Sequence, residues 1–350
     1  MALLFMDSFD HYATADITEK WTSVSDASHP VIGAYGRTGT QGLLLSGANQ
    51  IGSVVMTVLG GVDEAIVGFA FKLASGAPSG AALWAFGSAN AWECGVRLNA
   101  DLTLQPVRCA TNFQPGAPNF LTGIGVATTA ALQVGVWAYI EIQMKVSATV
   151  GTCTIRINGN GVTAQTGLNT LGAVAALTRI GIGGLATSAG ACHYDDVVVM
   201  NTAGSLNNSF IGDVTVSAIY PSAAGNSSGW TPSAGSNYQC VDEAAPNDDT
   251  DYNATATLNA KDLYAFADAP AGADIRAVQV LAAVRKGAEG PGQVKLVTRS
   301  SSTDYDGAAK GIGGTSYSYV REVLETDPAT AAAWSESGFN AAEFGIKKTA

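Results

Sequence analysis

Charged residues are scarce in this chain, and basic residues are the scarcest of them. Asp, Glu, Lys and Arg make up 13% of the 350 residues, and 18 Lys and Arg against 29 Asp and Glu leave a net charge of −11. A nucleic-acid partner requires clustered Lys and Arg that neutralise phosphates, so this balance argues against one. Ser, Thr, Asn, Gly and Ala must then form much of the surface. Such a surface can pack into an assembly without burying many ions.

Long apolar runs are also missing. None approaches the roughly 18 consecutive residues that a membrane-spanning helix needs, so we expect no membrane partner. The start of the chain, residues 1–16, has only a short apolar stretch and no basic flank, which argues against a signal peptide.

Cysteine is sparse and follows no ligand or redox pattern. The odd count and wide spacing favour reduced, buried thiols in a chain that folds in a reducing cytosol. Two of them flank one predicted hairpin, and a disulfide between those two stays open. No CxxC pair and no zinc spacing occurs among Cys94, Cys109, Cys153, Cys192 and Cys240.

Glycine and hydrophobic residues are abundant. The chain contains 41 glycines, and 47% of its residues are hydrophobic. This composition is typical of many short strands joined by tight turns and not of a disordered chain.

Residues 137–161 carry the clearest local pattern. Side chains alternate along the first strand, so Ile140 points inward while Tyr139 and Glu141 point outward. A second strand over 153–157 ends in Asn-Gly-Asn-Gly, which tolerates the positive φ of a tight reversal. The segment therefore predicts a β-hairpin with one buried face.

Strand patterns recur every ten or so residues along the whole chain. They predict an all-β protein with two tandem antiparallel β-sandwich (jelly-roll) domains, residues 1–203 and 213–350. A polar, turn-rich linker is expected at 204–212, followed by a strand over 214–218. The helical pattern near residues 329–343 is interrupted by proline and glycine, so we expect only a short helix there.

Four stretches of the first half follow one another in a recognisable order. They are Asp-Ser-Phe-Asp at 7–10, the hairpin over 136–159, Tyr-Asp-Asp-Val-Val-Val at 194–199 and Phe-Ile-Gly-Asp-Val at 210–214. Together they resemble the concanavalin A-like lectin/glucanase (laminin-G-like) jelly rolls found in bacteriophage virion proteins.

The second half carries Trp-Thr-Pro-Ser at 230–233, a polar stretch at 235–243, Asp-Leu-Tyr at 262–264 and a tail around 334–345. It resembles a C-terminal β-domain appended to that jelly roll in phage structural proteins. The resemblance implies a virion component made in a bacterial cytoplasm. Its implied partners are other virion proteins and further copies of itself, with a trimer favoured.

Groups for acid–base chemistry are poorly placed. Glucanases of this superfold need two carboxylates close together on one face of a strand. Glu141 has Gln143 at the next same-face position, Glu93 stands alone, and the adjacent Asp195 and Asp196 are expected to point to opposite faces. The histidines, at 11, 29 and 193, lie in no catalytic motif. We therefore predict no catalytic residue and no enzymatic activity.

An acidic stretch at 247–253 follows Asp242 and is the strongest metal candidate. Oxygen-bearing side chains that include Asp242, Asp249 and Asp251 have the chemistry that calcium prefers. The spacing lacks the glycine and the distal Glu of an EF-hand, so a solvated acidic loop is favoured. No other cofactor is expected.

Aromatic residues supply the candidates for ligand contact, because the C–H face of a sugar stacks on an exposed ring. Trp84, Trp92 and Trp230 fall at strand ends or in loops, and Trp137 and Tyr139 lie on the polar face of the hairpin. Packing in a core or an interface is the favoured alternative for each.

These patterns and the resemblance together predict a non-enzymatic structural component of a bacteriophage virion. We expect it to be tail- or fibre-associated, to mediate assembly and to attach to a host-surface glycan. Two alternatives remain: a capsid-decorating, head-associated protein and a bacterial carbohydrate-binding module. A glycan-degrading enzyme would require a second carboxylate that acts with Glu141.

Overall fold

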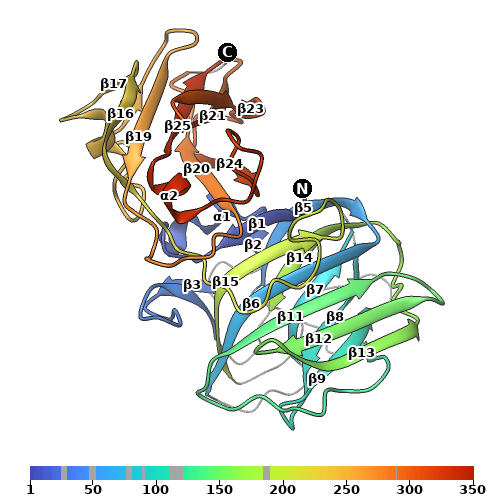
Figure 1. Cartoon of the computed structure of the whole chain (residues 1–350). Coiled ribbons are helices and arrows are strands. Elements are labelled where there is room, and N and C mark those ends of the chain that lie inside the picture. The colour runs from blue at the N-terminus through green and yellow to red at the C-terminus, as the bar shows by residue number, and fades with distance from the viewer. Residues whose placement is uncertain are drawn as a thin grey trace. The chain divides into compact units, whose positions relative to one another are not determined.

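The computed structural model describes residues 1–24, 30–46, 53–75, 81–88, 91–109, 121–183, 190–288 and 290–350, so His29 lies outside it. The chain forms two compact units (Figure 1). Unit 1 comprises Met1–Phe9 and Ala13–Val216, and unit 2 comprises Asp10–Tyr12 and Ser217–Ala350. Sheets of antiparallel strands dominate both units, which confirms the predicted all-β sandwich class.

Unit 1 contains two large sheets. The first, sheet A, has the order β13-β12-β11-β6-β15-β4-β3, and β1 also pairs with β15. Its strands are β13 (Asn160–Leu168), β12 (Gly151–Ile157), β11 (Ala138–Lys145), β6 (Glu64–Ser75), β15 (Ala191–Asn201), β4 (Gly42–Leu45), β3 (Pro30–Gly33) and β1 (Leu3–Asp7).

The second sheet of unit 1, sheet B, has the order β10-β9-β8-β7-β14-β5-β2. Its strands are β10 (Leu121–Gly123), β9 (Leu104–Cys109), β8 (Trp92–Leu98), β7 (Ala81–Gly87), β14 (Leu177–Gly183), β5 (Ser53–Val62) and β2 (Ser23–Val24). A 3-10 turn (Thr14–Asp16) and the short helix α1 (Ile17–Lys20) precede β2.

The core of unit 1 lies between the two sheets. Phe69 of β6 stacks on Trp84 of β7 with ring centroids 5.0 Å apart, and Tyr194 of β15 packs 5.8 Å from Phe69. The five cysteines are buried and unbridged, as predicted, so Cys94 and Cys109 form no disulfide.

The predicted hairpin is confirmed. β11 pairs with β12 in a register that places Ile142 opposite Ile155. Asn158 and Gly159, at φ of 52° and 74°, then reverse the chain into β13. The predicted strand over 214–218 is wrong, because residues 202–220 contain no strand.

Unit 2 is built on a sheet with the order β16-β19-β25-β21-β22, in which β23 also pairs with β21. Its strands are β16 (Pro221–Ser228), β19 (Lys261–Phe266), β25 (Glu343–Lys348), β21 (Gln293–Ser300), β22 (Thr303–Asp306) and β23 (Lys310–Gly311). Two smaller sheets pair β17 (Thr231–Pro232) with β18 (Asn253–Ala254), and β20 (Val278–Val284) with β24 (Ser318–Leu324).

The core of unit 2 gathers apolar side chains from the large sheet, from β20 and β24, and from the short helix α2 (Glu336–Asn340). Trp334, Phe339 and Phe344 form its aromatic centre, with ring centroids 5.7 to 6.4 Å apart. The helix α2 is little more than one turn long and is capped by Ser335, whose hydroxyl accepts a hydrogen bond from the backbone N–H of Gly338 at 3.0 Å.

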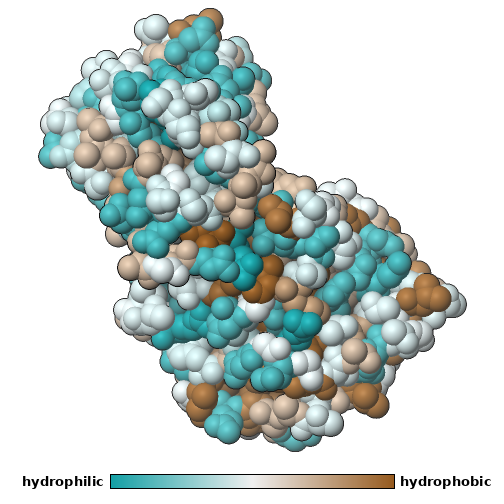
Figure 2. Space-filling model, viewed as in Figure 1, coloured by the Kyte–Doolittle hydropathy of each residue, from teal (hydrophilic) through white to brown (hydrophobic). Residues whose placement is uncertain are grey.

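The visible surface is mostly hydrophilic or neutral, with hydrophobic residues in small separate patches (Figure 2). This agrees with a surface in which uncharged polar residues replace charges. No helix among the described residues is long and apolar enough to cross a membrane.

The Asp-Ser-Phe-Asp stretch of unit 1 has a structural role. Asp7 is fully buried and accepts hydrogen bonds from Lys20 Nζ at 2.9 Å and from Trp21 Nε1 at 2.7 Å. It also accepts one from the backbone N–H of Phe9 at 2.9 Å, a residue held at a φ of 61°. The Lys20 side chain is 1% exposed, so its ion pair with Asp7 is shielded from water.

We expect Asp7→Ala to lower the free energy of unfolding by about 3–5 kcal/mol, because it removes a buried carboxylate that pairs with a buried ammonium and accepts hydrogen bonds from Trp21 and Phe9. Urea unfolding followed by tryptophan fluorescence measures this loss. Asp63→Ala is the control, since it removes an exposed pair with Lys145 at 3.6 Å and should cost no more than about 1 kcal/mol. Equal losses in the two variants would contradict the structural role of Asp7.

Candidate functional site

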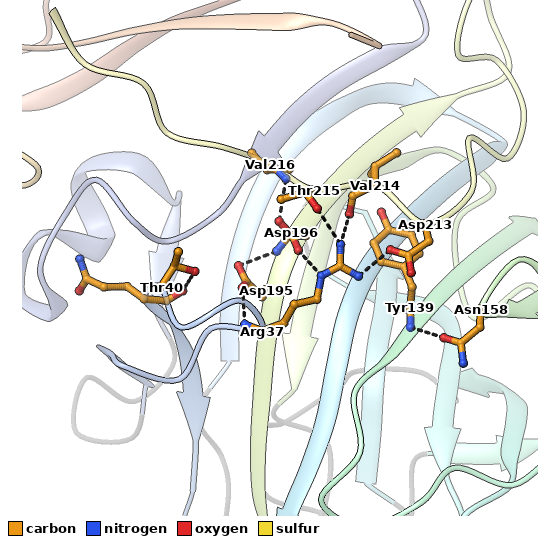
Figure 3. Close-up of polar contacts among 11 residues, drawn as sticks. Arg37, Thr40, Tyr139, Asn158, Asp195, Asp196, Asp213, Val214, Thr215 and Val216 are labelled. Atoms are coloured by element: carbon orange, nitrogen blue, oxygen red, sulfur yellow. Dashed lines mark hydrogen bonds and ion pairs between the residues drawn. The ribbon is translucent and has the colours of Figure 1, made fainter. Parts of the chain in front are cut away.

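The outer face of sheet A is covered at its centre by residues 210–216, which we call the strap. Glu141 Oε1 accepts a hydrogen bond from the backbone N–H of Gly212 at 2.9 Å. Asp196 Oδ1 accepts one from the backbone N–H of Val216 at 2.6 Å (Figure 3). The strap thus bonds to side chains of the sheet and not to a neighbouring strand, which is why the predicted strand is absent.

Arg37 fastens the strap (Figure 3). Its guanidinium lies 2.5 Å from Asp213 Oδ1 and 2.8 Å from Asp196 Oδ2. It also donates to the carbonyl oxygen of Val214 at 2.6 Å and to Thr215 Oγ1 at 3.0 Å. The Arg37 side chain is only 15% exposed, so these ion pairs are partly shielded from water.

Asp195 and Asp196 both face Arg37 and the strap, which corrects the prediction that they point to opposite faces. Asp195 Oδ2 accepts from the backbone N–H of Arg37 at 2.8 Å, while Asp196 pairs with the guanidinium. Asp196 has a φ of 51°, and the pairing of β15 with β6 shifts between Asp195 and Val198. This irregularity breaks the alternation of side chains along the strand.

Tyr139 lies beneath this assembly and is 1% exposed, so it is corrected from a ligand contact to a core residue. Its ring lies over Gly68 of β6, where an added Cβ would come within 2.7 Å of Tyr139 Oη. The Arg37 guanidinium lies 5.4 Å from the centre of the ring. The outer face of the hairpin is therefore itself buried at Tyr139 and Glu141.

Trp84 and Trp92 are also corrected. Trp84 is fully buried between the sheets, and Trp92 is 7% exposed with the Arg179 guanidinium 4.5 Å from its ring centre. Trp230 in unit 2 is half-buried, and its Nε1 donates to the carbonyl oxygen of Ala260 at 3.1 Å. The first two rings offer no face to a ligand, and the third serves to join two segments of its unit.

Trp137 is different, because it belongs to a row of half-buried side chains on the outer face of sheet A. We call Tyr35, Lys72, Trp137 and His193 the aromatic row. The Lys72 ammonium lies 4.8 Å from the centre of the Trp137 ring. His193 lies 6.3 Å from Trp137 and 5.1 Å from Tyr35, measured between ring centroids. All four side chains are partly exposed.

Sheet register explains how the aromatic row forms. His193 of β15 lies directly opposite Lys72 of β6, and Trp137 immediately precedes β11 on the other side of β6. Tyr35 follows β3, and its ring folds back over Gly33, where an added Cβ would come within 2.9 Å of it.

The aromatic row and the strap contacts are built from the same segments. Arg37 follows Tyr35 by two residues in the sequence. In the same way, Asp195 follows His193 and Tyr139 follows Trp137. His193 and Asp195 lie two apart on β15, so they share a face and are separated by roughly 7 Å, whereas Tyr35 and Arg37 lie in the turn after β3. The fastening of the strap therefore positions the aromatic row as well.

Sequence reasoning missed three members of the aromatic row: His193, Tyr35 and Lys72. Burial, with a smaller contribution from the charge of Lys72, lowers the pKa of His193. Its ring is therefore neutral at pH 7. Its position two residues before Asp195 on the same strand was a signal in the sequence that it belongs to this surface. The residues that lie beside His193 come from distant segments of the chain.

Carboxylates near the strap and in sheet B are held in structural contacts. Glu93 is fully buried and accepts from Ser88 Oγ at 3.2 Å and from the backbone N–H groups of Ala173 and Val174 at 2.6 and 3.0 Å. Gln143 donates to Glu64 at 2.7 Å. Neither Glu93 nor Glu141 shares an open face with a second carboxylate.

The predicted calcium ligands are not gathered into a site. Asp249 accepts from the Arg285 guanidinium at 2.6 and 3.0 Å, and Asp251 accepts from Asn247 Nδ2 at 2.6 Å. Asp242 is exposed. Within the described ranges, no three His, Cys, Asp or Glu side chains are arranged to hold a metal ion.

Residues of the second-half motifs surround Asp262, which is fully buried. Asp262 Oδ1 accepts from the backbone N–H of Trp230 at 2.8 Å. Its Oδ2 accepts from Asn237 Nδ2 at 2.6 Å and from the Tyr264 hydroxyl at 3.0 Å. These residues form a structural network and not a ligand site.

No family model and no curated protein matches this sequence. Among solved structures, Trypanosoma rangeli sialidase in complex with the inhibitor DANA aligns with a TM-score of 0.34 at 16% identity, over 57% of this chain and 30% of that one. The carbohydrate binding module CBM66 from Bacillus subtilis aligns with a TM-score of 0.34 at 8% identity, over 51% of this chain and 94% of that one. The binding domain of Paraclostridial Mosquitocidal Protein 1 aligns with a TM-score of 0.32 at 12% identity, over 49% and 42%. Because these scores are low, the function is inferred from the side chains of this chain.

Glu141 generates a pH-dependent prediction. Burial raises its pKa, so the folded protein holds this proton to a higher pH than the unfolded chain does. Above the raised pKa the buried carboxylate is charged, and this charge lowers the free energy of unfolding. The loss disappears as the pH falls toward 4.5 and the carboxylate takes up its proton. We therefore expect the free energy of unfolding of Glu141→Gln, minus that of the parent protein, to decrease as the pH is lowered from 7 to 4. Urea unfolding across this range measures it, and a difference that stays constant would contradict the prediction.

Proposed function

We propose that this protein is a non-enzymatic binding protein whose unit 1 binds a saccharide at the aromatic row. The observation that carries the proposal is the group of three half-buried rings, Tyr35, Trp137 and His193, on one open part of a sheet face. Rings in this setting present apolar area beside polar edges, which suits the mixed C–H and hydroxyl surface of a sugar.

Rigidity supports the same function. His193 of β15 lies directly opposite Lys72 of β6, Trp137 immediately precedes β11 on the other side of β6, and the ring of Tyr35 is seated on Gly33. Side chains held in place before binding lose little conformational freedom when the ligand arrives. The aromatic row is therefore suited to binding without rearrangement.

A non-enzymatic role is supported by the carboxylates. Hydrolysis of a glycosidic bond requires an acid and a second carboxylate beside the same bond. Glu141 lies under the strap and Glu93 holds the backbone of residues 173–174, so neither lies beside the aromatic row. Turnover on a polysaccharide panel that is lost in Glu141→Gln would overturn this part of the proposal.

Trp137→Ala is expected to weaken saccharide binding about tenfold, since the loss of an aromatic stacking surface costs on the order of 1 kcal/mol or more. The measurement uses the full chain on a panel of immobilised glycans, followed by titration of those that bind. Tyr252→Ala is the matched control, because it removes a 40% exposed ring in unit 2. Equal effects of the two variants, or no binding by the parent to any glycan, would contradict the proposed function.

The setting we propose is a bacteriophage particle, tail- or fibre-associated, where several copies of the protein display the aromatic row. The resemblance of the sequence to phage virion proteins supports this, as does a surface poor in charge that packs readily against neighbours. Several copies, with three favoured, would turn weak single-site binding into firm attachment.

Copy number tests the setting. We expect a purified particle to contain the protein in a small multiple of three, measured by quantitative mass spectrometry against the major capsid protein. Hundreds of copies per particle would favour the capsid-decorating alternative, and absence from particles would favour a bacterial carbohydrate-binding module. Either of these results would contradict the tail or fibre role.

A further inference from the structure

We propose that the aromatic row selects acidic saccharides, those carrying a carboxylate or a sulfate ester, over neutral ones, and that Lys72 contacts the acidic group. This inference rests on the saccharide-binding function proposed above. It adds the charge of the ligand and the residue that recognises it.

Charge compensation distinguishes Lys72 from the other cation on this part of the sheet. Arg37 is paired with Asp196 and Asp213. Lys72 has no carboxylate within ion-pairing distance among the described residues, and its ammonium lies against the Trp137 ring. In a chain with a net charge of −11, an ammonium without a carboxylate partner on an aromatic surface points to an anion supplied by the ligand.

The contact that Lys72 already makes is one that a ligand can replace. A partly exposed ammonium gains little from lying over a ring, whereas a hydrogen bond between two ions is among the stronger polar contacts. A sugar stacked on Trp137 would bring its acidic group beside the ammonium, 4.8 Å from the ring centre. The ion and the stacking surface would then bind different parts of one sugar residue.

His193 supplies a second polar contact at the same place. It lies directly opposite Lys72 in the pairing of β15 with β6. Its Nδ1 is buried and has no hydrogen-bond partner among the described residues. Lys72 and Tyr35 are its neighbouring groups that carry or can carry charge. Asp195, two residues along β15, accepts from the backbone N–H of Arg37, whose guanidinium pairs with Asp196 and Asp213. The neutral imidazole therefore adds hydrogen bonding, and Lys72 adds the positive charge.

The test is a panel of acidic saccharides, each with a neutral counterpart of the same sugar sequence. Uronate-bearing oligosaccharides are compared with their methyl esters, and sulfated oligosaccharides with their desulfated forms. We expect the full-length protein to bind acidic members at least about tenfold more tightly than their counterparts. The two arms show which acidic group is preferred.

Variants assign the preference to Lys72. Lys72→Met keeps the length of the side chain and should remove the preference, so that acidic members and their neutral counterparts bind with equal affinity. Lys72→Arg should retain the preference, which guards against loss of folding as the cause. Lys145→Met is the control, because it removes the same charge from the far end of β11.

The outcomes separate the two proposals. Equal binding of acidic and neutral members would overturn the charge selection and leave the saccharide-binding function standing. Equal loss in Lys72→Met and Lys145→Met would also overturn it, because the effect would then follow overall charge. Binding to no member of either kind would overturn both proposals.

Discussion

The fastening of the strap by Arg37 is the interaction on which the outer face of sheet A depends. Tyr139, Glu141, Asp195 and Asp196 are all nearly inaccessible to water, although they lie on what an isolated sheet would expose. Burying acidic groups is unfavourable unless cations and hydrogen-bond donors replace the lost water. The strap provides backbone N–H groups and Arg37 provides the cation. Because the same segments carry the aromatic row, the contacts that compensate the buried carboxylates also determine the position of the binding surface.

The motifs that carry the resemblance to known virion proteins have structural roles in both units. Asp7 compensates a buried lysine in unit 1, and Asp262 joins three segments in unit 2. Both carboxylates are fully buried, and neither is aimed at a ligand. These two motif residues stabilise the fold, whereas three members of the surface proposed for binding, Tyr35, Lys72 and His193, lie outside the motifs.

Local periodicity was sufficient to predict the strands and the all-β class. The hairpin pattern around Ile142 and the Asn158-Gly159 reversal required only neighbouring residues, and both are confirmed. Alternation also predicts which side of a strand a residue occupies, but it cannot say what covers that side. Tyr139 was therefore placed on the polar face of the hairpin without its cover, because that cover comes from Arg37 and the strap, both distant in sequence. Asp196 was misplaced because alternation assumes a regular strand, and a residue with positive φ interrupts it. Trp137 was found by alternation alone, while its neighbours Lys72 and His193 required the register of three strands.

The segment Asp10–Tyr12 belongs to unit 2 although the residues on both sides of it belong to unit 1. The carbonyl oxygen of His11 accepts a hydrogen bond from the hydroxyl of Tyr319 at 3.0 Å, and the ring of His11 lies 5.7 Å from that of Tyr319. During synthesis Tyr319 emerges some three hundred residues after these three. Unit 1 can begin to fold as its own strands emerge, but the contacts that unit 2 makes with Asp10–Tyr12 must wait until Tyr319 has been made. This segment therefore joins its own unit only after the strands of unit 1 have been synthesised.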